Sequence, residues 1–176
     1  MFYKIVLFVI SLALSTYASL DIKNLDNFKS DFTQKIESSN NKEILYEGKL
    51  FIRKDKKVLW QYKTPIVKNV YVSNSYVIVD EPELEQAIYT TLKDEINIAK
   101  LLKKAKKIEK NSYVANYQDT KYYITTNDKK MIKEIQYKDK LDNSVTITFK
   151  NIETNKEIKD SVFKFVAPTH YDIIRK

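Results

Sequence analysis

The sequence predicts a mainly β domain, in which one antiparallel sheet curls into a barrel or half-barrel beneath two amphipathic helices. About ten short apolar-rich segments are separated by tight polar turns, as in all-β domains. Along them apolar and polar residues alternate, so that Val58, Trp60 and Tyr62 fall on one face of a strand. A sheet of so many strands curls rather than staying flat. Two stretches with a helical period are the candidates to cover its concave face.

The first helix is expected over residues 25–36, because Leu25, Phe28, Phe32 and Ile36 recur at three- and four-residue spacing. The second is expected over residues 93–109, where Leu101 and Leu102 belong to an apolar side opposite many lysines. Strands are expected between and after the helices, at residues 44–53, 58–62, 67–73, 76–80, 86–90, 113–117, 121–126, 131–138, 145–151 and 162–166.

The N-terminus has the features of a secretion signal. Lys4 precedes an apolar run over residues 5–14, and Thr16 and Ala18 supply small residues at the positions that a signal peptidase reads. The run is too short for a bilayer-spanning helix, which needs about 20 apolar residues. We therefore predict a cleavable signal peptide over residues 1–18, a single domain over 19–176 and export of the mature protein. An uncleaved anchor is the alternative.

The composition excludes several classes of site. The chain has no cysteine, which excludes disulfides, thiolate metal sites and lipid attachment at an N-terminal cysteine. Its formal charge is +8, but the lysines are spread along the chain, which favours a solvated basic surface over a nucleic-acid site. The cluster at Lys103, Lys104, Lys106 and Lys107 is interpreted as the solvated face of the second helix. Attraction to an anionic membrane or an acidic partner stays open.

Catalysis finds little support in the residues. His170 is the single histidine, and Gly48 is the single glycine, so histidine-based catalytic sites, histidine metal sites and two-glycine phosphate loops are not expected. A hidden carboxylate pair is the remaining enzymatic alternative, and no cofactor or metal is predicted. Gly48 is expected where a side chain cannot fit, at a bulge or bend of a strand. The 13 Tyr, 8 Phe and 1 Trp fit either ordinary strand preference or an apolar concavity for a greasy ligand.

Four stretches, taken in order, carry a family resemblance. They are Phe28-x-x-x-Phe32-x-Gln34, then Gly48-x-Leu50-x-Ile52 leading to Trp60-x-Tyr62-x-x-Pro65, then residues 84–87, and then Phe163-x-Phe165-x-x-Pro168. After a signal peptide, this set resembles the LolA family of periplasmic lipoprotein carriers. The chain departs from the family at Lys54 and Asp55, where Arg-Pro is usual, and it lacks the glycine that commonly follows the last proline.

The resemblance implies an unclosed antiparallel β-barrel covered by an α-helical lid, with an apolar cavity for the acyl chains of lipoproteins. Arg53 and Lys54 are the candidates for the family's lid latch. The implied partners are acylated lipoproteins as cargo, an inner-membrane ABC release complex of the LolCDE type, and an outer-membrane acceptor that is LolB-like or the membrane itself. A monomer that binds no nucleic acid is expected. The cavity-lining candidates are Phe28, Phe32, Leu50, Ile52, Val58, Trp60, Tyr62, Leu101 and Leu102.

Two alternatives accompany this interpretation. A receptor of the LolB type is disfavoured, because it needs a lipidated cysteine. A periplasmic lipid or lipoprotein sensor on the same fold, as in RseB-like regulators, is the second hypothesis, although such proteins usually carry a further domain. An enzyme is the third.

Overall fold

The computed structural model describes residues 27–73, 75–91 and 98–176. The predicted signal peptide and its cleavage site lie outside these ranges. The described part contains one α-helix, α1 (Ile98–Lys104), and two short 3-10 helices, η2 (Pro82–Leu84) and η3 (Asp160–Phe163). Its strands are β1 Phe28–Glu37, β2 Glu43–Ile52, β3 Val58–Thr64, β4 Lys68–Val72, β5 Tyr76–Glu81, β6 Gln86–Thr91, β7 Lys106–Glu109, β8 Ser112–Tyr117, β9 Thr120–Thr126, β10 Ile132–Lys138, β11 Ser144–Thr154 and β12 Asp172–Arg175.

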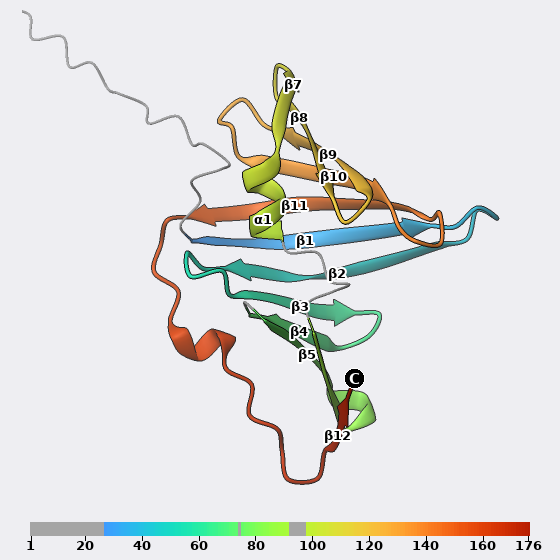
Figure 1. The fold of residues 1–176 in the computed structure, drawn as a ribbon, viewed down its shortest axis with the longest axis vertical. Coiled ribbons are helices and arrows are strands. Elements are labelled where there is room, and N and C mark those ends of the chain that lie inside the picture. The colour runs from blue at the N-terminus through green and yellow to red at the C-terminus, as the bar shows by residue number, and fades with distance from the viewer. Residues whose placement is uncertain (1–26, 74, 92–97) are drawn as a thin grey trace, which may run out of the picture.

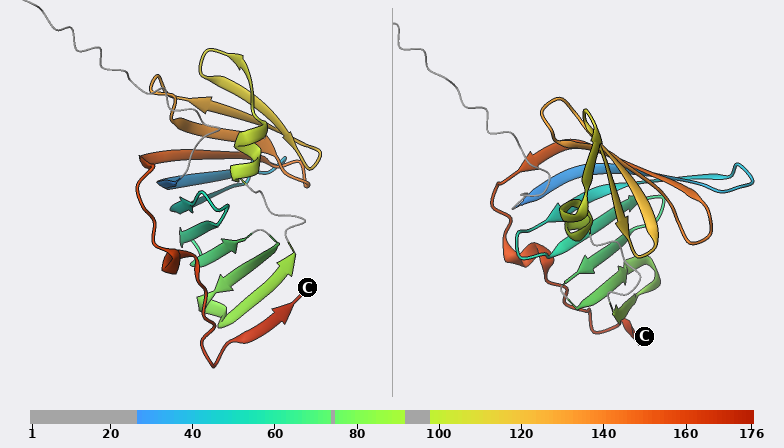
Figure 2. Two further views of the ribbon diagram at one scale, coloured as in Figure 1. Left: turned by 60° about the vertical axis from the view of Figure 1, so that its left-hand side comes forward. Right: turned by 45° about the horizontal axis from the view of Figure 1, so that its top comes forward.

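All twelve described strands belong to one open sheet. Its order is β12-β6-β5-β4-β3-β2-β1-β11-β10-β9-β8-β7, and neighbouring strands are antiparallel except for the parallel pair of β12 with β6. The sheet is strongly curved, and α1 lies against its concave side (Figures 1 and 2). β7 and β12 form the two edges and do not meet. The predicted unclosed β-architecture is confirmed in these residues.

Nine of the ten predicted strands are present, at β2–β6 and β8–β11. The predicted first helix is wrong, because the chain forms β1 from Phe28 to Glu37. A spacing of four residues fits the strand period of two as well as the helical period of 3.6. Along β1 burial alternates, and the strand pairs with β2 on one side and β11 on the other. Phe28 and Phe32 therefore reach the core from the sheet and not from a covering helix.

The second helix is confirmed in part. α1 spans Ile98–Lys104, whereas residues 106–109 of the predicted helix form the edge strand β7. The residues predicted as its first turn lie outside the described ranges. The expected two-helix cover is thus wrong in its first half, and in the described part of the chain α1 alone stands over the concave face.

The C-terminal segment also differs from its prediction. No strand forms over residues 162–166, where η3 and an extended stretch run along the outer face of β4–β6 (Figure 2). Phe165 packs there on the rings of Tyr71 and Tyr89, at centroid distances of 5.6 and 6.4 Å. Both edges of β4 and β5 are already hydrogen-bonded to neighbouring strands, so this segment can add side chains but no further strand. The chain reaches a free edge later, where β12 pairs with β6.

Candidate functional site

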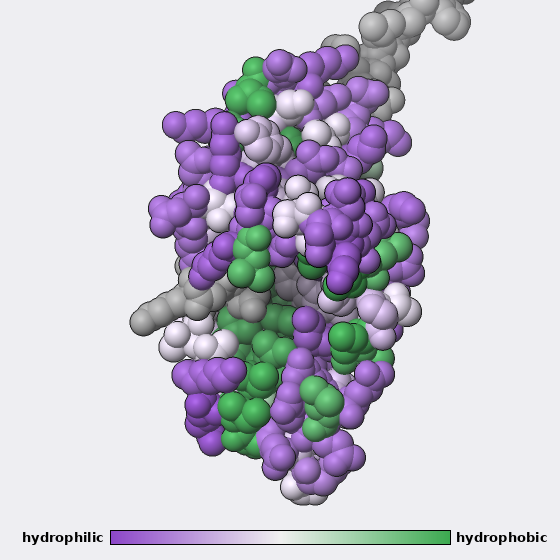
Figure 3. All heavy atoms as spheres, turned by 90° about the vertical axis from the view of Figure 1, so that its right-hand side faces the viewer, coloured by the Kyte–Doolittle hydropathy of each residue, from purple (hydrophilic) through white to green (hydrophobic). Residues whose placement is uncertain are grey.

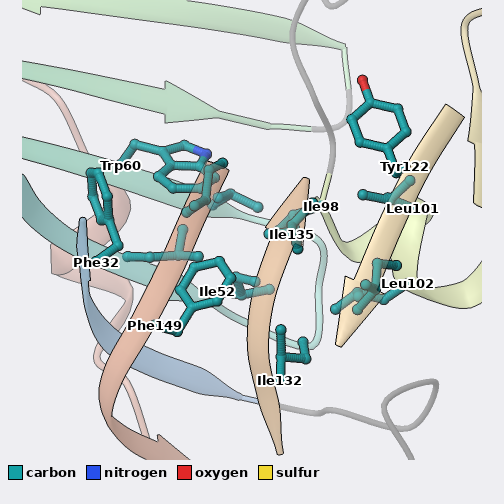
Figure 4. Packing of buried hydrophobic residues seen from close by; sticks show 14 of the residues in the cluster. Phe32, Ile52, Trp60, Ile98, Leu101, Leu102, Tyr122, Ile132, Ile135 and Phe149 are labelled. Carbon is teal, nitrogen blue, oxygen red and sulfur yellow. The ribbon is translucent and has the colours of Figure 1, made fainter. Parts of the chain in front are cut away.

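The core of the molecule is an apolar interior between the concave face and α1. Phe32 on β1 meets the rings of Trp60 and Tyr62 on β3 edge-on, at centroid distances of 5.0 and 5.2 Å. This edge-to-face geometry is the favoured one for aromatic pairs. Phe28 packs in the same way on Phe149 of β11, at 5.9 Å. Strands β3, β1 and β11, with β2 between β3 and β1, therefore present an aromatic floor (Figure 4).

Gly48 makes this floor possible. A β-carbon built on Gly48 would lie 2.1 Å from the backbone carbonyl oxygen of Gln61 and 2.9 Å from two ring carbons of Phe32. The register of β2 and β3 shifts between Glu47 and Gly48, which marks a bulge or irregularity. The sequence prediction that this glycine occupies a place closed to side chains is confirmed. Because Gly48 has no side chain, the Phe32 ring can occupy the space beside it and contact Trp60.

Helix α1 supplies the opposite wall. Ile98, Leu101 and Leu102 are buried, and they belong to the same cluster as the aromatic floor. Figure 4 shows Leu101 and Leu102 beside Tyr122 of β9, with Ile135 of β10 between them and the floor. The described side chains of α1 form no hydrogen bond or ion pair with the sheet; the ammonium of Lys104 lies 5.4 Å from the ring centre of Tyr117. Apolar contact therefore holds the helix in place.

One end of the interior combines polar and exposed apolar groups. The hydroxyl of Tyr62 donates to Oε1 of Gln34 over 3.0 Å, and the ammonium of Lys68 lies 4.7 Å from the Tyr62 ring centre. Ile66 and Val67, in the adjoining β3–β4 connection, are exposed. Seen from this side, apolar side chains gather on the surface below its centre (Figure 3). We call this end of the interior, at Tyr62, Ile66 and Val67, the apolar mouth.

This architecture coincides with a known family. The family model for "Outer membrane lipoprotein carrier protein LolA" matches residues 23–129. An outer-membrane lipoprotein carrier protein of Campylobacter jejuni is 37% identical over 157 residues, which cover 89% of this chain and 90% of the relative. One from Wolinella succinogenes is 32% identical, with 93% and 95% covered. The chain belongs to the LolA family.

Solved structures agree on the fold. An uncharacterized conserved protein from Thermus thermophilus matches with a TM-score of 0.56 at 6% identity, covering 90% of this chain and 95% of that one. A LolA superfamily protein from Nitrosomonas europaea matches with a TM-score of 0.51 at 9% identity, covering 81% and 91%. At such low identity these similarities support the fold, an open curved sheet, and nothing further.

In this LolA-family chain the nine predicted cavity residues come together. Phe28, Phe32, Leu50, Ile52, Val58, Trp60, Leu101 and Leu102 are buried members of one cluster, and Tyr62 is half-buried against it. Their role in binding lipid stays a prediction. The sequence analysis missed the far wall, which comes from Tyr122, Ile132, Ile135, Val145 and Ile147. Alternation along those strands signalled two faces, but no motif marked which face belongs to the interior.

The predicted latch residues occupy the β2–β3 turn. The guanidinium of Arg53 binds the carboxylates of Asp55 and Asp160 and lies 5.2 Å from the ring centre of Phe163. Lys57 and Lys164 also reach Asp160, over 2.7 and 3.0 Å. Hydrogen bonds from Lys57, Lys164 and Arg53, in that order, hold the pKa of Asp160 well below its usual range. This group fastens η3 to the β2–β3 turn.

Lys54 differs from Arg53. Its side chain is exposed and has no hydrogen-bond or ion-pair partner among the described residues, while its backbone N–H donates to Oδ1 of Asn27 over 3.3 Å. The lid-latch role of the two residues stays a prediction. The contacts of Arg53 join the C-terminal segment to the sheet.

The interior offers shape and apolar surface. Within residues 27–73, 75–91 and 98–176, no group of three or more His, Asp or Glu side chains is arranged to hold a metal ion. No helix in the same ranges is long and apolar enough to cross a bilayer. Burial raises the pKa of Tyr122, as expected for a phenol in apolar surroundings. The described interior is thus built from apolar side chains.

Proposed function

We propose that this chain is a periplasmic carrier, which binds the acyl chains of lipoproteins released from the inner membrane and delivers them to the outer membrane. The observation that carries the proposal is the membership of the LolA family, supported by relatives named outer-membrane lipoprotein carrier proteins. The apolar interior supplies a physical means, because its buried apolar side chains match the chemistry of acyl chains. The role requires no covalent chemistry and no cofactor.

The energetic need for a carrier follows from the cargo. Each methylene moved from water into an apolar site is worth about 0.8 kcal/mol, so an acyl chain with about 14 methylenes is stabilised by roughly 11 kcal/mol. An anchor with two or three such chains cannot cross an aqueous space unshielded. The nine predicted cavity residues are proposed as the lining that shields them.

Loading requires α1 to move. Phe32, Trp60 and Leu101 are packed against their neighbours, so an acyl chain can enter only where these contacts give way. Because α1 is held by non-directional apolar contact, acyl chains can replace the groups that it leaves behind. We therefore propose α1 as a movable lid, closed in this structure.

The lid-latch role of Arg53 and Lys54 is part of the same proposal. Arg53 and Lys54 are proposed to restrain the lid, with Arg53 acting through the C-terminal segment that it binds at Asp160. Replacing both residues with leucine should leave the sheet folded and keep cargo on the carrier. Normal delivery by a well-folded double variant would remove the latch role.

The proposed partners are acylated lipoproteins, an inner-membrane release complex of the LolCDE type, and an outer-membrane acceptor or the membrane itself. The carrier is proposed to work as a monomer. Depletion in cells should leave lipoproteins in the inner-membrane fraction. Complementation by a Leu101→Asn variant should fail at normal protein levels, while Leu141→Asn should succeed, since Leu101 is 0% exposed and Leu141 is 82% exposed. A normal lipoprotein distribution after depletion would contradict the carrier function.

A further inference from the structure

The positive charge of the chain is concentrated in one part of the fold. Residues 98–138, which form α1 and β7–β10, contain eleven lysines and four acidic residues, a net charge of +7. The whole chain has a formal charge of +8. The other strands and the C-terminal segment are therefore nearly neutral. Such asymmetry produces a strong local potential that attracts anions to one side of the molecule.

Some lysines elsewhere in the fold pair with carboxylates, whereas a group within this part does not. In the described part of the chain, Lys29, Lys35 and Lys49 on β1 and β2 pair with Glu153, Glu37 and Asp31 at 3.1, 3.0 and 3.9 Å. Among the same described residues, no such pair forms at a second group of exposed lysines, which we call the basic end. The basic end consists of Lys106, Lys107, Lys110, Lys129 and Lys130.

The fold brings the basic end together from two turns. Nδ2 of Asn111, in the β7–β8 turn, donates to Oδ1 of Asp128 in the β9–β10 turn over 3.0 Å. The backbone N–H of Thr126 donates to the carbonyl of Asn111 over 2.9 Å. Lysines 19 or more residues apart in sequence, such as Lys110 and Lys129, are thereby fixed on neighbouring turns. Between Lys107 and Glu109, Ile108 is 54% exposed.

We propose that the basic end binds the surface of an anionic phospholipid bilayer. Each unpaired lysine near such a surface strengthens the binding of a protein to it about fivefold. This electrostatic attraction needs no shape complementarity. The exposed Ile108 among them adds an apolar group that can enter the headgroup layer, as in other interfacial segments. An acidic protein partner would gain nothing from Ile108 unless it offered a matching apolar site. The proposal goes beyond the carrier function, because it concerns the unloaded protein and requires no cargo.

The test uses vesicles and the protein without residues 1–18, whose apolar run would itself enter a bilayer. The chain from Ser19 retains every described residue. Sedimentation with phosphatidylcholine vesicles that contain about one-third phosphatidylglycerol should show binding that falls with salt, while pure phosphatidylcholine should show none. Replacing the five lysines of the basic end with glutamine should weaken binding by roughly a thousandfold, because about fivefold is lost for each lysine.

A matched control removes the same charge elsewhere. It replaces five exposed lysines outside the basic end, Lys42, Lys56, Lys63, Lys159 and Lys176, with glutamine. This variant should stay within about threefold of the unchanged protein. Ile108→Ser should weaken vesicle binding by a factor of a few. This loss should be the same at low and high salt, because it comes from an apolar contact. Circular dichroism verifies that all variants are folded.

Three results would overturn the proposal. Equal losses in the two five-lysine variants would assign the binding to net charge alone. Absence of binding to the anionic vesicles would exclude the bilayer. Binding to polyglutamate without binding to vesicles would assign the basic end to an acidic protein. None of these results bears on cargo transport, so the two proposals fail separately.

Discussion

Replacing Gly48 with alanine tests the packing on which the aromatic floor depends. The new β-carbon would lie 2.1 Å from the carbonyl oxygen of Gln61 and 2.9 Å from the Phe32 ring. The first contact is with backbone, so it cannot be relieved by a rotamer change. β2 and β3 must separate locally by about an ångström, and the Phe32 ring must tilt away from Trp60.

The magnitude follows from two opposing effects. Overpacking a closed site costs about 1–3 kcal/mol, and a backbone clash belongs at the upper end of that range. Removing the flexibility of glycine returns roughly 0.5–1 kcal/mol. We therefore expect Gly48→Ala to lower the free energy of unfolding by about 2 kcal/mol.

Urea unfolding followed by Trp60 fluorescence measures this change. The native emission should also shift, because the Phe32 ring that packs 5.0 Å from Trp60 is displaced. Glu47→Ala, at the exposed neighbouring position, is the control and should change the stability by less than about 0.5 kcal/mol. A Gly48→Ala variant as stable as the unchanged protein would refute the close approach of β2 and β3.

Further predictions concern the lid, the C-terminal segment, the interior and the N-terminus. Leu101→Asn should lower the free energy of unfolding by about 2–5 kcal/mol in thermal or urea melts, since it breaks a closed apolar contact, while Leu141→Asn should leave it nearly unchanged. Unchanged melting together with unchanged cargo binding in Leu101→Asn would show that α1 is no lid. Asp160→Asn should make a protease cleave the C-terminal segment faster, because the variant weakens the ion pairs that hold this segment on the sheet. Because the pKa of Asp160 is lowered from 3.8, this carboxylate stabilises the fold above that pH, and the stabilisation is lost as the pH falls further. The stability of the Asp160→Asn variant should therefore lack this dependence on pH. Trp60 emission should shift when acylated cargo binds, and a spectrum unaffected by saturating cargo would count against the cavity. N-terminal sequencing of exported protein should begin at Ser19.

The sequence was sufficient for most strands, because alternation and polar turns are local signals. The prediction was wrong at β1, where the residues on the buried face do not follow the apolar–polar alternation of a strand. Ser30 is 1% exposed and Gln34 is 9% exposed, so two polar residues occupy the buried face that alternation would assign to apolar ones. What remained visible was the four-residue spacing of Phe28, Phe32 and Ile36, which both periods allow.

The site was predictable to the extent that motifs marked it. The hairpin with Gly48 and Trp60 identified the floor of the interior, and the period of the second helix identified Leu101 and Leu102. The contacts of Arg53 with Asp160 join residues 107 positions apart, and no local pattern announces such a pair. The same holds for β12, whose parallel pairing with β6 depends on where the C-terminal segment ends.

The two edges of the open sheet bear on how such a protein stays dispersed. A sheet that does not close leaves unpaired backbone groups, which in other proteins template edge-to-edge aggregation. Here each edge strand has four residues, and all four in β7 are exposed and include Lys106 and Lys107. Short, charged edges of this kind discourage the addition of a second sheet. An open sheet with such edges can therefore keep an adaptable interior without promoting aggregation through its edge strands.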